Sequence, residues 1–393
     1  MKLAAIITTY CKHSHAQHIC DRFLEGYGWQ GRHHRPELDL VSMYVDQVKD
    51  NDLSDVRAQR FRDLTIYPSI AEALTLGGGH LAVDGVLLIA EHGDYKRNEK
   101  GQILYPRYEF FTAMIELFKR SGSTVPVFND KHLSWNWDYC REMYDTAVAM
   151  GFAFMAGSSL PVTRRLPPVE IPYGARVEEG LCLGYGSVDS YDFHGLEAIQ
   201  CMVERRKGGE SGVVWMDTYR GDRFWEAHEK QVWSADLFEA ALSRSDNLQL
   251  DQPGFNWVWP TLSELKANVR DPIAYHYQHT DGLKCTLILL NGLLWDFNVA
   301  VRVAGETEPV STQIHLPMPQ QSSNQATFFS PLCRAIEDIF LSGRPTIPVE
   351  RTLLTSGLTC AAVDSLFAGQ KRVETPHLAI SYAAPEASLF WNS

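Results

Sequence analysis

The sequence has no stretch of about 18 consecutive apolar residues, which is the length that a membrane-spanning helix needs. The apolar run after Met1 stops at Thr8 without a small-residue cleavage site, so we expect no secretory signal. The eight cysteines form no CxxC pair, and in a chain without an export signal they are expected to remain thiols. These absences predict a soluble protein of the cytoplasm.

Positive charge is also scarce in this sequence. The sequence has 36 Lys and Arg residues and 48 Asp and Glu residues, which gives a formal net charge of −12. Because nucleic acids and anionic lipids bind basic surfaces, this balance argues against both as partners and favours a small molecule. The hydrophobic content of 45% is enough for a buried core, and 393 residues suggest two domains or one large one.

The first third of the chain alternates short apolar runs with helical stretches. This alternation is typical of parallel βαβ units, and it predicts a Rossmann-like, doubly wound parallel sheet of the α/β class. The clearest strand is VDGVLLIA, a continuous apolar run with turn residues on both sides. Strands are expected at 3–7, 38–45, 83–90, 125–128 and 152–156, and helices at 14–25, 70–76, 108–120 and 137–150.

A proline-rich joint at 166–172 ends this alternation. We therefore predict a Rossmann-like domain over 1–165, followed by an α+β domain over 166–393 that serves substrate binding and oligomerisation and includes the C-terminal helices. Strand patterns without intervening helices favour a largely antiparallel sheet in the second domain. Strands are expected at 213–219, 274–279, 285–291 and 297–303, and helices at 195–204, 330–341 and 353–367.

Five short motifs occur in an order that matches this arrangement of elements. They are His15-Ala16, the strand from Asp84 to Ala90, Asp130-Lys131-His132, His194-Gly195-Leu196-Glu197, and Gly343-Arg344-Pro345 with the later Val373-Glu374-Thr375-Pro376. Together they resemble the glucose–fructose oxidoreductase / inositol dehydrogenase (Gfo/Idh/MocA) family. The resemblance spans most of the chain, and it implies the same two-domain fold.

The resemblance also implies roles for individual residues. Lys131 corresponds to the lysine of the family's EKP tripeptide, which sits at the reacting centre. Lys131, His194 and Glu197 are thus the expected catalytic residues. The segment before His194 and an arginine before the proline-rich joint suggest substrate contacts, namely Tyr191, Asp192 and Arg164.

The turn after the first strand departs from the family. The family's three fingerprint glycines, which give the tight turn and admit the pyrophosphate, correspond here to Ile7, Thr9 and Lys12. Asp46, after the second strand, stands where an acidic residue would hold a ribose hydroxyl. If a nucleotide binds, Thr9, Lys12 and Asp46 are its expected contacts, but NAD(P) is less expected than is usual for the family.

Histidines and carboxylates follow several of the expected strands. Parallel strands direct their carboxyl ends to one crevice, so these side chains should meet there. The resemblance implies that His194 and Glu197 face the same crevice. Two chemistries remain open. In one, a divalent ion such as Zn²⁺ or Mn²⁺ is bound by His15, His92, Asp130 and His132. In the other there is no metal, and Lys131 and His194 act as acid and base.

These features predict a carbohydrate-active enzyme of the lyase or isomerase type. Its reaction would be an acid–base, metal-assisted elimination, hydration or isomerisation of a sugar or keto-sugar. The alternative is an NAD(P)-dependent sugar or polyol oxidoreductase with an atypical nucleotide turn, and a third possibility is a non-catalytic binding protein. A homo-oligomer is expected from the resemblance, since an open face of the antiparallel sheet would seek a partner.

Overall fold

The computed structural model describes residues 1–248, 260–317 and 325–392. They form two compact units, the first built from 1–159 with 317–356 and the second from 160–316 with 357–392. We predicted a single division at 165/166, without a return of the chain to the first unit. Helix α11 (Val349–Phe367) begins in the first unit and ends in the second.

The first unit is built on a six-stranded parallel sheet in the order β5-β4-β1-β6-β7-β8. Strand β1 lies between β4 and β6 and pairs in parallel with both, as the alternating pattern predicts. The prediction of a parallel sheet containing residues 3–7 and 83–90 is therefore confirmed. The strands are β1 (Lys2–Ile7), β4 (Asp39–Val45), β5 (Thr65–Ile66), β6 (Gly85–Ile89), β7 (Val127–Asp130) and β8 (Phe154–Gly157).

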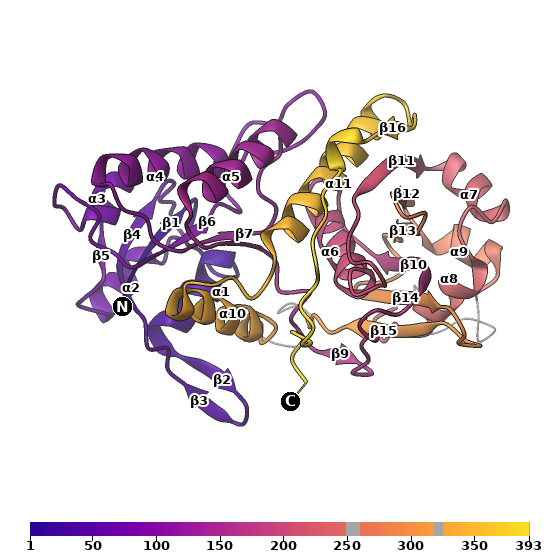
Figure 1. Cartoon of the computed structure of the whole chain (residues 1–393), viewed down its shortest axis with the longest axis horizontal. Helices are drawn as coiled ribbons and strands as arrows, with labels where there is room; N and C mark the ends of the chain where they lie inside the picture. Colours follow the sequence, from indigo (N-terminus) through magenta and orange to yellow (C-terminus); the bar gives the residue numbers. More distant parts are fainter. Residues whose placement is uncertain (249–259, 318–324, 393) are drawn as a thin grey trace. The chain divides into compact units, whose positions relative to one another are not determined.

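Helices cover both faces of this sheet. Figure 1 shows α3, α4 and α5 along one face and α1 with α10 along the other. Helix α1 starts where the sequence predicts, because the Ser14 side chain accepts a hydrogen bond from the backbone N–H of Gln17 and caps the helix. The helices are α1 (His15–Glu25), α2 (Ser54–Arg60), α3 (Ile70–Thr75), α4 (Arg107–Ser121), α5 (Trp137–Met150) and α10 (Phe329–Ser342).

A hairpin that the sequence did not predict anchors α10 in the first unit. It consists of β2 (Tyr27–Trp29) and β3 (Arg32–His34). The Tyr27 hydroxyl donates to Glu337 of α10, and His34 Nε2 lies 2.8 Å from the same carboxylate. Since Glu337 is fully buried, these contacts satisfy a charge that would otherwise be costly, and they help to hold α10 in the first unit.

The second unit is built on an eight-stranded sheet in the order β16-β11-β12-β13-β10-β14-β15-β9. The sheet is antiparallel apart from the pairing of β10 with β13, so the predicted fold class is confirmed. The unpredicted strand β10 lies in its interior. The strands are β9 (Arg165–Leu166), β10 (Val177–Gly184), β11 (Val213–Arg220), β12 (Ile273–His279), β13 (Lys284–Leu289), β14 (Phe297–Val303), β15 (Val310–Ile314) and β16 (Val373–Glu374).

Both faces of this second sheet carry helices. Gly180 of β10 faces α6 (Tyr191–Val203), since a Cβ added there would lie 3.0 Å from Val203. The adjacent Leu181 packs on the opposite face in an apolar cluster with residues of α7, α8 and α9. The prediction of an open apolar face is therefore wrong, whereas the homo-oligomer stays a prediction. The remaining helices are α7 (Asp222–Glu229), α8 (Ala235–Leu242), α9 (Leu262–Asn268) and the 3-10 turn η1 (Pro376–Leu378).

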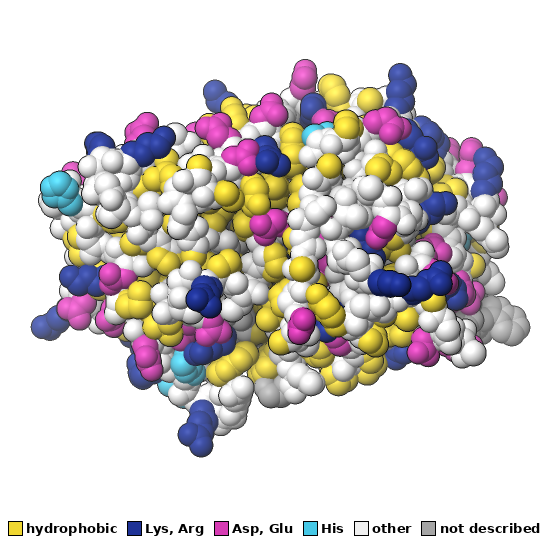
Figure 2. Space-filling view, viewed as in Figure 1, with side chains coloured by type: hydrophobic (Ala, Val, Ile, Leu, Met, Phe, Trp, Pro, Cys, Tyr) yellow, Lys and Arg dark blue, Asp and Glu magenta, His cyan; other side chains and the backbone are white. Residues whose placement is uncertain are grey.

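The surface carries charges of both signs. Figure 2 shows acidic and basic side chains interspersed over the face in view. Within the described residues, no helix combines the length and apolar character that crossing a membrane requires.

Candidate active site

Polar side chains gather at the carboxyl edge of the first unit's sheet. Glu91 follows β6, Asp130 ends β7 and Lys131 comes directly after it, while His15 opens α1 after the turn that leaves β1. The carboxyl ends of parallel strands meet at one edge, which is why residues distant in sequence become neighbours here. His15, His92 and Asp130, which the sequence predicted to meet, are brought together within this one unit.

His15 and Asp130 form a hydrogen-bonded pair. His15 Nδ1 lies 2.7 Å from Asp130 Oδ2, and the Asp130 side chain is fully buried. Two further rings orient the imidazole, because Phe329 and His92 meet it edge-on at centroid distances of 5.1 Å and 5.3 Å. The His15 side chain remains 16% exposed. The pair therefore consists of a buried carboxylate and an accessible imidazole.

Glu91 is placed between two cations. Lys131 Nζ lies 2.8 Å from Glu91 Oε1, and the fully buried guanidinium of Arg107 donates to Glu91 Oε2. Burial alone would raise the pKa of Glu91, but Lys131 and Arg107 outweigh it and hold the pKa well below its usual range. Glu91 is therefore an anion that fixes two positive charges beside the His15–Asp130 pair. Nothing in the sequence singles out Arg107. The sequence indicates this charged cluster only through Glu91, which follows the clearest strand.

Three buried histidines of this region, His18, His92 and His132, are held neutral. Burial lowers the pKa of His92 to about 4, and it lowers those of His18 and His132 to about 3. His132 lies near Arg107 on one side and near the Ser134 carbonyl, 3.0 Å from Nδ1, on the other.

The structure does not assemble the expected metal ligands. Both ring nitrogens of His132 have protein neighbours, and Asp130 Oδ2 is engaged by His15. Among residues 1–248, 260–317 and 325–392, no group of three or more His, Cys, Asp or Glu side chains could hold a metal ion. The metal hypothesis built on His15, His92, Asp130 and His132 therefore has no support.

The backbone at this edge is strained. His13, His92 and Lys131 all have positive φ angles, of 66°, 70° and 63°. Residues other than glycine adopt this left-handed conformation at an energetic cost, and such strain concentrates at functional sites. Several buried polar atoms at the same edge have no hydrogen-bond partner within the described part of the chain, namely Thr9 Oγ1, His92 Nε2, Asn129 Oδ1 and Asp130 Oδ1. In native proteins such atoms call for an explanation, such as an ordered water, an ion or a catalytic role.

The turn after β1 is packed against the loop that follows β4. The backbone N–H groups of Gln47 and Leu53 donate to the carbonyls of Thr8 and Tyr10, at 2.8 Å and 2.7 Å. The Tyr10 side chain is fully buried in this turn. Two carbonyl groups of this turn are thus bonded to the loop after β4.

The three predicted nucleotide contacts are placed as follows. Thr9 is buried, at 4% exposure, and Lys12 is exposed. Asp46 accepts hydrogen bonds from the hydroxyls of Tyr44 and Tyr95, one on each carboxylate oxygen, at 2.9 Å and 2.7 Å. The residues present do not fit a dinucleotide in the pose that the fingerprint supports.

The second unit holds the other predicted site residues. Helix α6 starts four residues earlier than predicted, because the Asp192 carboxylate accepts the backbone N–H groups of Asp189, Ser190 and Phe193. Asp192 is fully buried and also accepts the Tyr275 hydroxyl, so its four hydrogen bonds are all to the protein. Burial raises the pKa of Asp192.

His194, Glu197 and Tyr191 lie on α6. His194 is 6% exposed and meets Tyr191 edge-on at a centroid distance of 5.7 Å, and Glu197 is buried. Arg164 is half-buried, with its guanidinium 3.8 Å from the centroid of the Trp391 ring. A role for these residues beside Lys131 would involve both units, and it stays a prediction.

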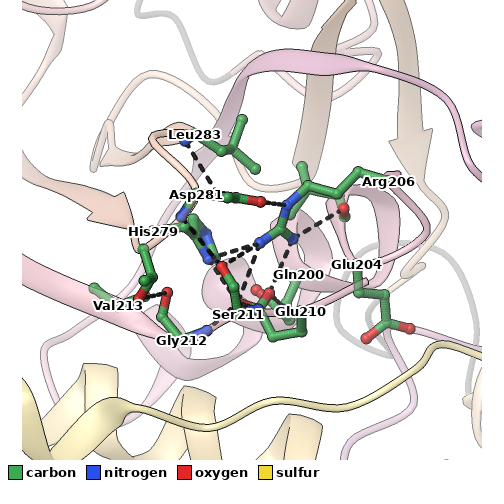
Figure 3. A network of polar contacts seen from close by, with 12 residues as sticks. Gln200, Glu204, Arg206, Glu210, Ser211, Gly212, Val213, His279, Asp281 and Leu283 are labelled. Carbon is green, nitrogen blue, oxygen red and sulfur yellow. Dashed lines mark hydrogen bonds and ion pairs between the residues drawn. The ribbon is translucent and has the colours of Figure 1, made fainter. Parts of the chain in front are cut away.

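A second polar network lies inside the second unit (Figure 3). Arg206 lies 3.0 Å from Glu210 and 2.6 Å from Asp281, and His279 Nδ1 is 2.8 Å from Glu210. Burial alone would raise the pKa of Glu210, but His279 and Arg206 outweigh it and lower the pKa strongly. The Arg206 side chain is buried, which is unusual for an arginine. Its charge is compensated, which makes the network a structural support of this unit.

Comparisons with known proteins agree with this architecture. No family model and no curated protein matches the sequence. Among solved structures, a myo-inositol dehydrogenase from Lactobacillus casei in complex with NAD(H) and myo-inositol has a TM-score of 0.58 at 10% identity, over 99% of both chains. GenD2 from gentamicin A biosynthesis, in complex with NAD, has a TM-score of 0.57 at 12% identity, over 95% of this chain and 96% of that one.

An oxidoreductase from Agrobacterium radiobacter in complex with NAD⁺, L-tartaric acid and magnesium is also similar. Its TM-score is 0.54 at 11% identity, over 95% of this chain and 98% of that one. At such low identity these likenesses show the fold and nothing finer. The two-domain fold that the resemblance implies is therefore confirmed.

Proposed function

We propose that this chain is an oxidoreductase that acts on a hydroxyl-bearing carbon of a sugar or polyol. The observation that carries the proposal is the buried cluster at the sheet edge, where the Lys131–Glu91 ion pair adjoins the His15–Asp130 pair. The structural neighbours support the redox class, since several were solved with NAD and one with myo-inositol. The comparisons thus favour the oxidoreductase alternative over the lyase or isomerase that we first expected.

The electron acceptor in this proposal is NAD(P), held in a pose that depends neither on a glycine turn nor on Asp46. Lys131 contacts the substrate oxygen. As the resemblance implies, His194 and Glu197 take part in catalysis, and Tyr191 and Arg164 contact the substrate. Asp192 acts by capping α6, since its oxygens are already used.

A second candidate is nucleotide-free proton transfer on the same class of substrate, as in an elimination or isomerisation. One observation favours it: the turn after β1 is closed by hydrogen bonds from the 47–53 loop, and Asp46 is engaged by two tyrosines. The same cluster would then move protons without a redox step.

Two assays on one purified protein separate these candidates. In the first, myo-inositol and L-tartrate are offered with NAD⁺ or NADP⁺, and the absorbance of the reduced nucleotide is followed. In the second, the same compounds are incubated in D₂O without nucleotide, and NMR follows the loss of C–H signals. Reduction of nucleotide supports the oxidoreductase, and exchange without nucleotide supports the second candidate. Lys131→Met should abolish either signal, while His33→Gln in the exposed hairpin serves as control. Binding without turnover would leave the non-catalytic alternative.

A further inference from the structure

We propose that His15, positioned by Asp130, is the acid–base residue of this site, and that Lys131 acts there as a fixed cation rather than as the base. The inference rests on the proposed function in one respect, namely that the substrate presents a hydroxyl group to this cluster. It assigns a proton-transfer role to a side chain of the first unit that we had first considered as a metal ligand.

The geometry of the pair selects one tautomer of His15. The Asp130 carboxylate is 2.7 Å from Nδ1, so the Nδ1–H bond points to the carboxylate and the lone pair is left on Nε2. Asp130 has no exposed surface, whereas His15 keeps 16%, so His15 is the member of the pair that a substrate can reach. The edge-on rings of His92 and Phe329 restrict rotation of the imidazole.

Lys131 is held in its charged form. Its ammonium lies 2.8 Å from Glu91, and an opposite charge at that distance favours the ionised states of both partners. Taking the proton from Lys131 would leave Glu91 with the single buried cation Arg107. The pair is therefore suited to stabilising negative charge on a substrate oxygen, which is the usual task of a fixed cation at a reacting centre.

The neighbouring histidines are less suited to the role. His92 and His18 are held neutral by burial, and His18 is stacked on Phe329 at a centroid distance of 4.9 Å. His132 lies between Arg107 and the Ser134 carbonyl. Among these histidines, His15 is the one paired with a carboxylate that would stabilise the imidazolium ion.

The proton-transfer step follows from this geometry. The O–H bond of the substrate breaks, its electron pair stays on the oxygen, and the proton forms a bond with His15 Nε2. The resulting imidazolium is stabilised by Asp130 and the alkoxide by Lys131. Two cations, Lys131 and Arg107, and two carboxylates, Glu91 and Asp130, cancel in the resting cluster. This balance favours a neutral polyhydroxy compound over an acid sugar as substrate.

The tautomer gives a test that requires no substrate. With ¹⁵N-labelled histidine, long-range N–H correlation spectra distinguish Nδ1–H from Nε2–H imidazoles, and His15→Gln identifies the His15 signals. We expect the Nδ1–H form in the wild-type protein and a shift towards the Nε2–H form in Asp130→Asn. A wild-type His15 in the Nε2–H form would overturn the proposal, whatever becomes of the proposed function.

Kinetic measurements then separate the acid–base role of His15 from the fixed charge of Lys131, on any substrate that the two assays identify. His15→Gln should lower kcat by about 100-fold or more with KM within about threefold, and added imidazole should restore part of the rate in His15→Ala. Lys131→Arg, which keeps the charge, should retain more activity than His15→Gln. The reverse order would make Lys131 the base, and it would overturn this proposal while leaving the proposed function intact.

Discussion

Tyr95 donates its hydroxyl to Asp46 across 2.7 Å, and this bond links the segment after β6 to the end of β4. In Rossmann folds an acidic residue at this position holds the ribose of a dinucleotide. Here the other carboxylate oxygen of Asp46 accepts the hydroxyl of Tyr44, so each oxygen already has one bond from the protein. The chain thus shares the fold of the NAD-bound neighbours, but its acidic residue after β4 is bonded to two tyrosines.

The first prediction concerns nucleotide affinity. Because both oxygens of Asp46 serve the protein, Asp46→Ala should change the Kd of NAD⁺ by less than about twofold. If Asp46 held the ribose, loss of that charged hydrogen bond would instead cost about 1.5–3 kcal/mol of binding free energy, which raises the Kd more than tenfold. Isothermal titration calorimetry on both proteins measures the difference. Micromolar wild-type affinity that disappears in Asp46→Ala would show that the usual pose is used after all.

The second prediction concerns the stability of the charged cluster. Glu91→Gln leaves the buried cations Lys131 and Arg107 without their carboxylate, which should cost about 3–5 kcal/mol of unfolding free energy. Urea denaturation followed by circular dichroism measures it. Asp145→Asn is the matched control, since its ion pair with Arg141 is about half exposed and should contribute less than about 1 kcal/mol. Equal losses in both variants would contradict the prediction.

The third prediction concerns pH. Burial lowers the pKa of His18 and His132 to about 3 and that of His92 and His276 to about 4, against an unfolded value near 6.5. Below 6.5 the unfolded chain therefore binds more protons than the folded one. The contribution of these histidines to the free energy of unfolding should be fully present above pH 7. It should fall progressively from pH 6.5 towards 3, because protonation of each histidine favours the unfolded chain.

Urea titrations at several pH values between 8 and 4 test this dependence. His276→Asn should reduce the slope, since each unit of pKa difference corresponds to about 1.4 kcal/mol. His80→Asn, at an exposed position, is the control. Stability that is constant between pH 7 and 5 would show that these histidines are not held neutral.

The sequence predicts the first unit well because its signals are local. The strand at 83–90 is a continuous apolar run, and helix α5 has the predicted bounds of Trp137–Met150. Strand β10 was missed because it shows neither a full alternating pattern nor a full apolar run. Its first half carries Glu178 and Glu179, and its second half is fully buried and contains two glycines. The helices α7, α8 and α9 have only seven or eight residues each, too short for a clear helical period.

The site was predictable only as far as topology determines it. His15 and Asp130 meet because parallel strands bring their carboxyl ends together, and that rule needs no coordinates. Arg107 and Arg206 were missed because their burial depends on Glu91 and Glu210, and an arginine in a sequence is normally a surface residue. The expected metal site has no support for a related reason: the types of residue in a sequence do not show which other partners their side-chain atoms have.

The last prediction compares two glycines of the second unit whose surroundings differ. Gly212 and Gly221 both have positive φ, of 90° and 63°. A Cβ on Gly212 would lie 2.4 Å from the Leu378 carbonyl oxygen and 2.8 Å from the Ile380 nitrogen, whereas a Cβ on Gly221 would meet nothing within 4 Å. Gly221→Ala should cost only the backbone strain, about 1–2 kcal/mol.

Gly212→Ala adds a collision with backbone, which cannot yield as a flexible side chain can, so the total should reach about 3 kcal/mol or more. The Gly212 N–H also donates to Glu210 Oε1 at 2.8 Å, so a shift of this turn would disturb the Arg206–Glu210–His279 network. Urea denaturation gives the free energies, and hydrogen exchange at Leu378 and Ile380 locates the change. If both variants lost the same stability, the close approach of the C-terminal segment to Gly212 would have to be abandoned.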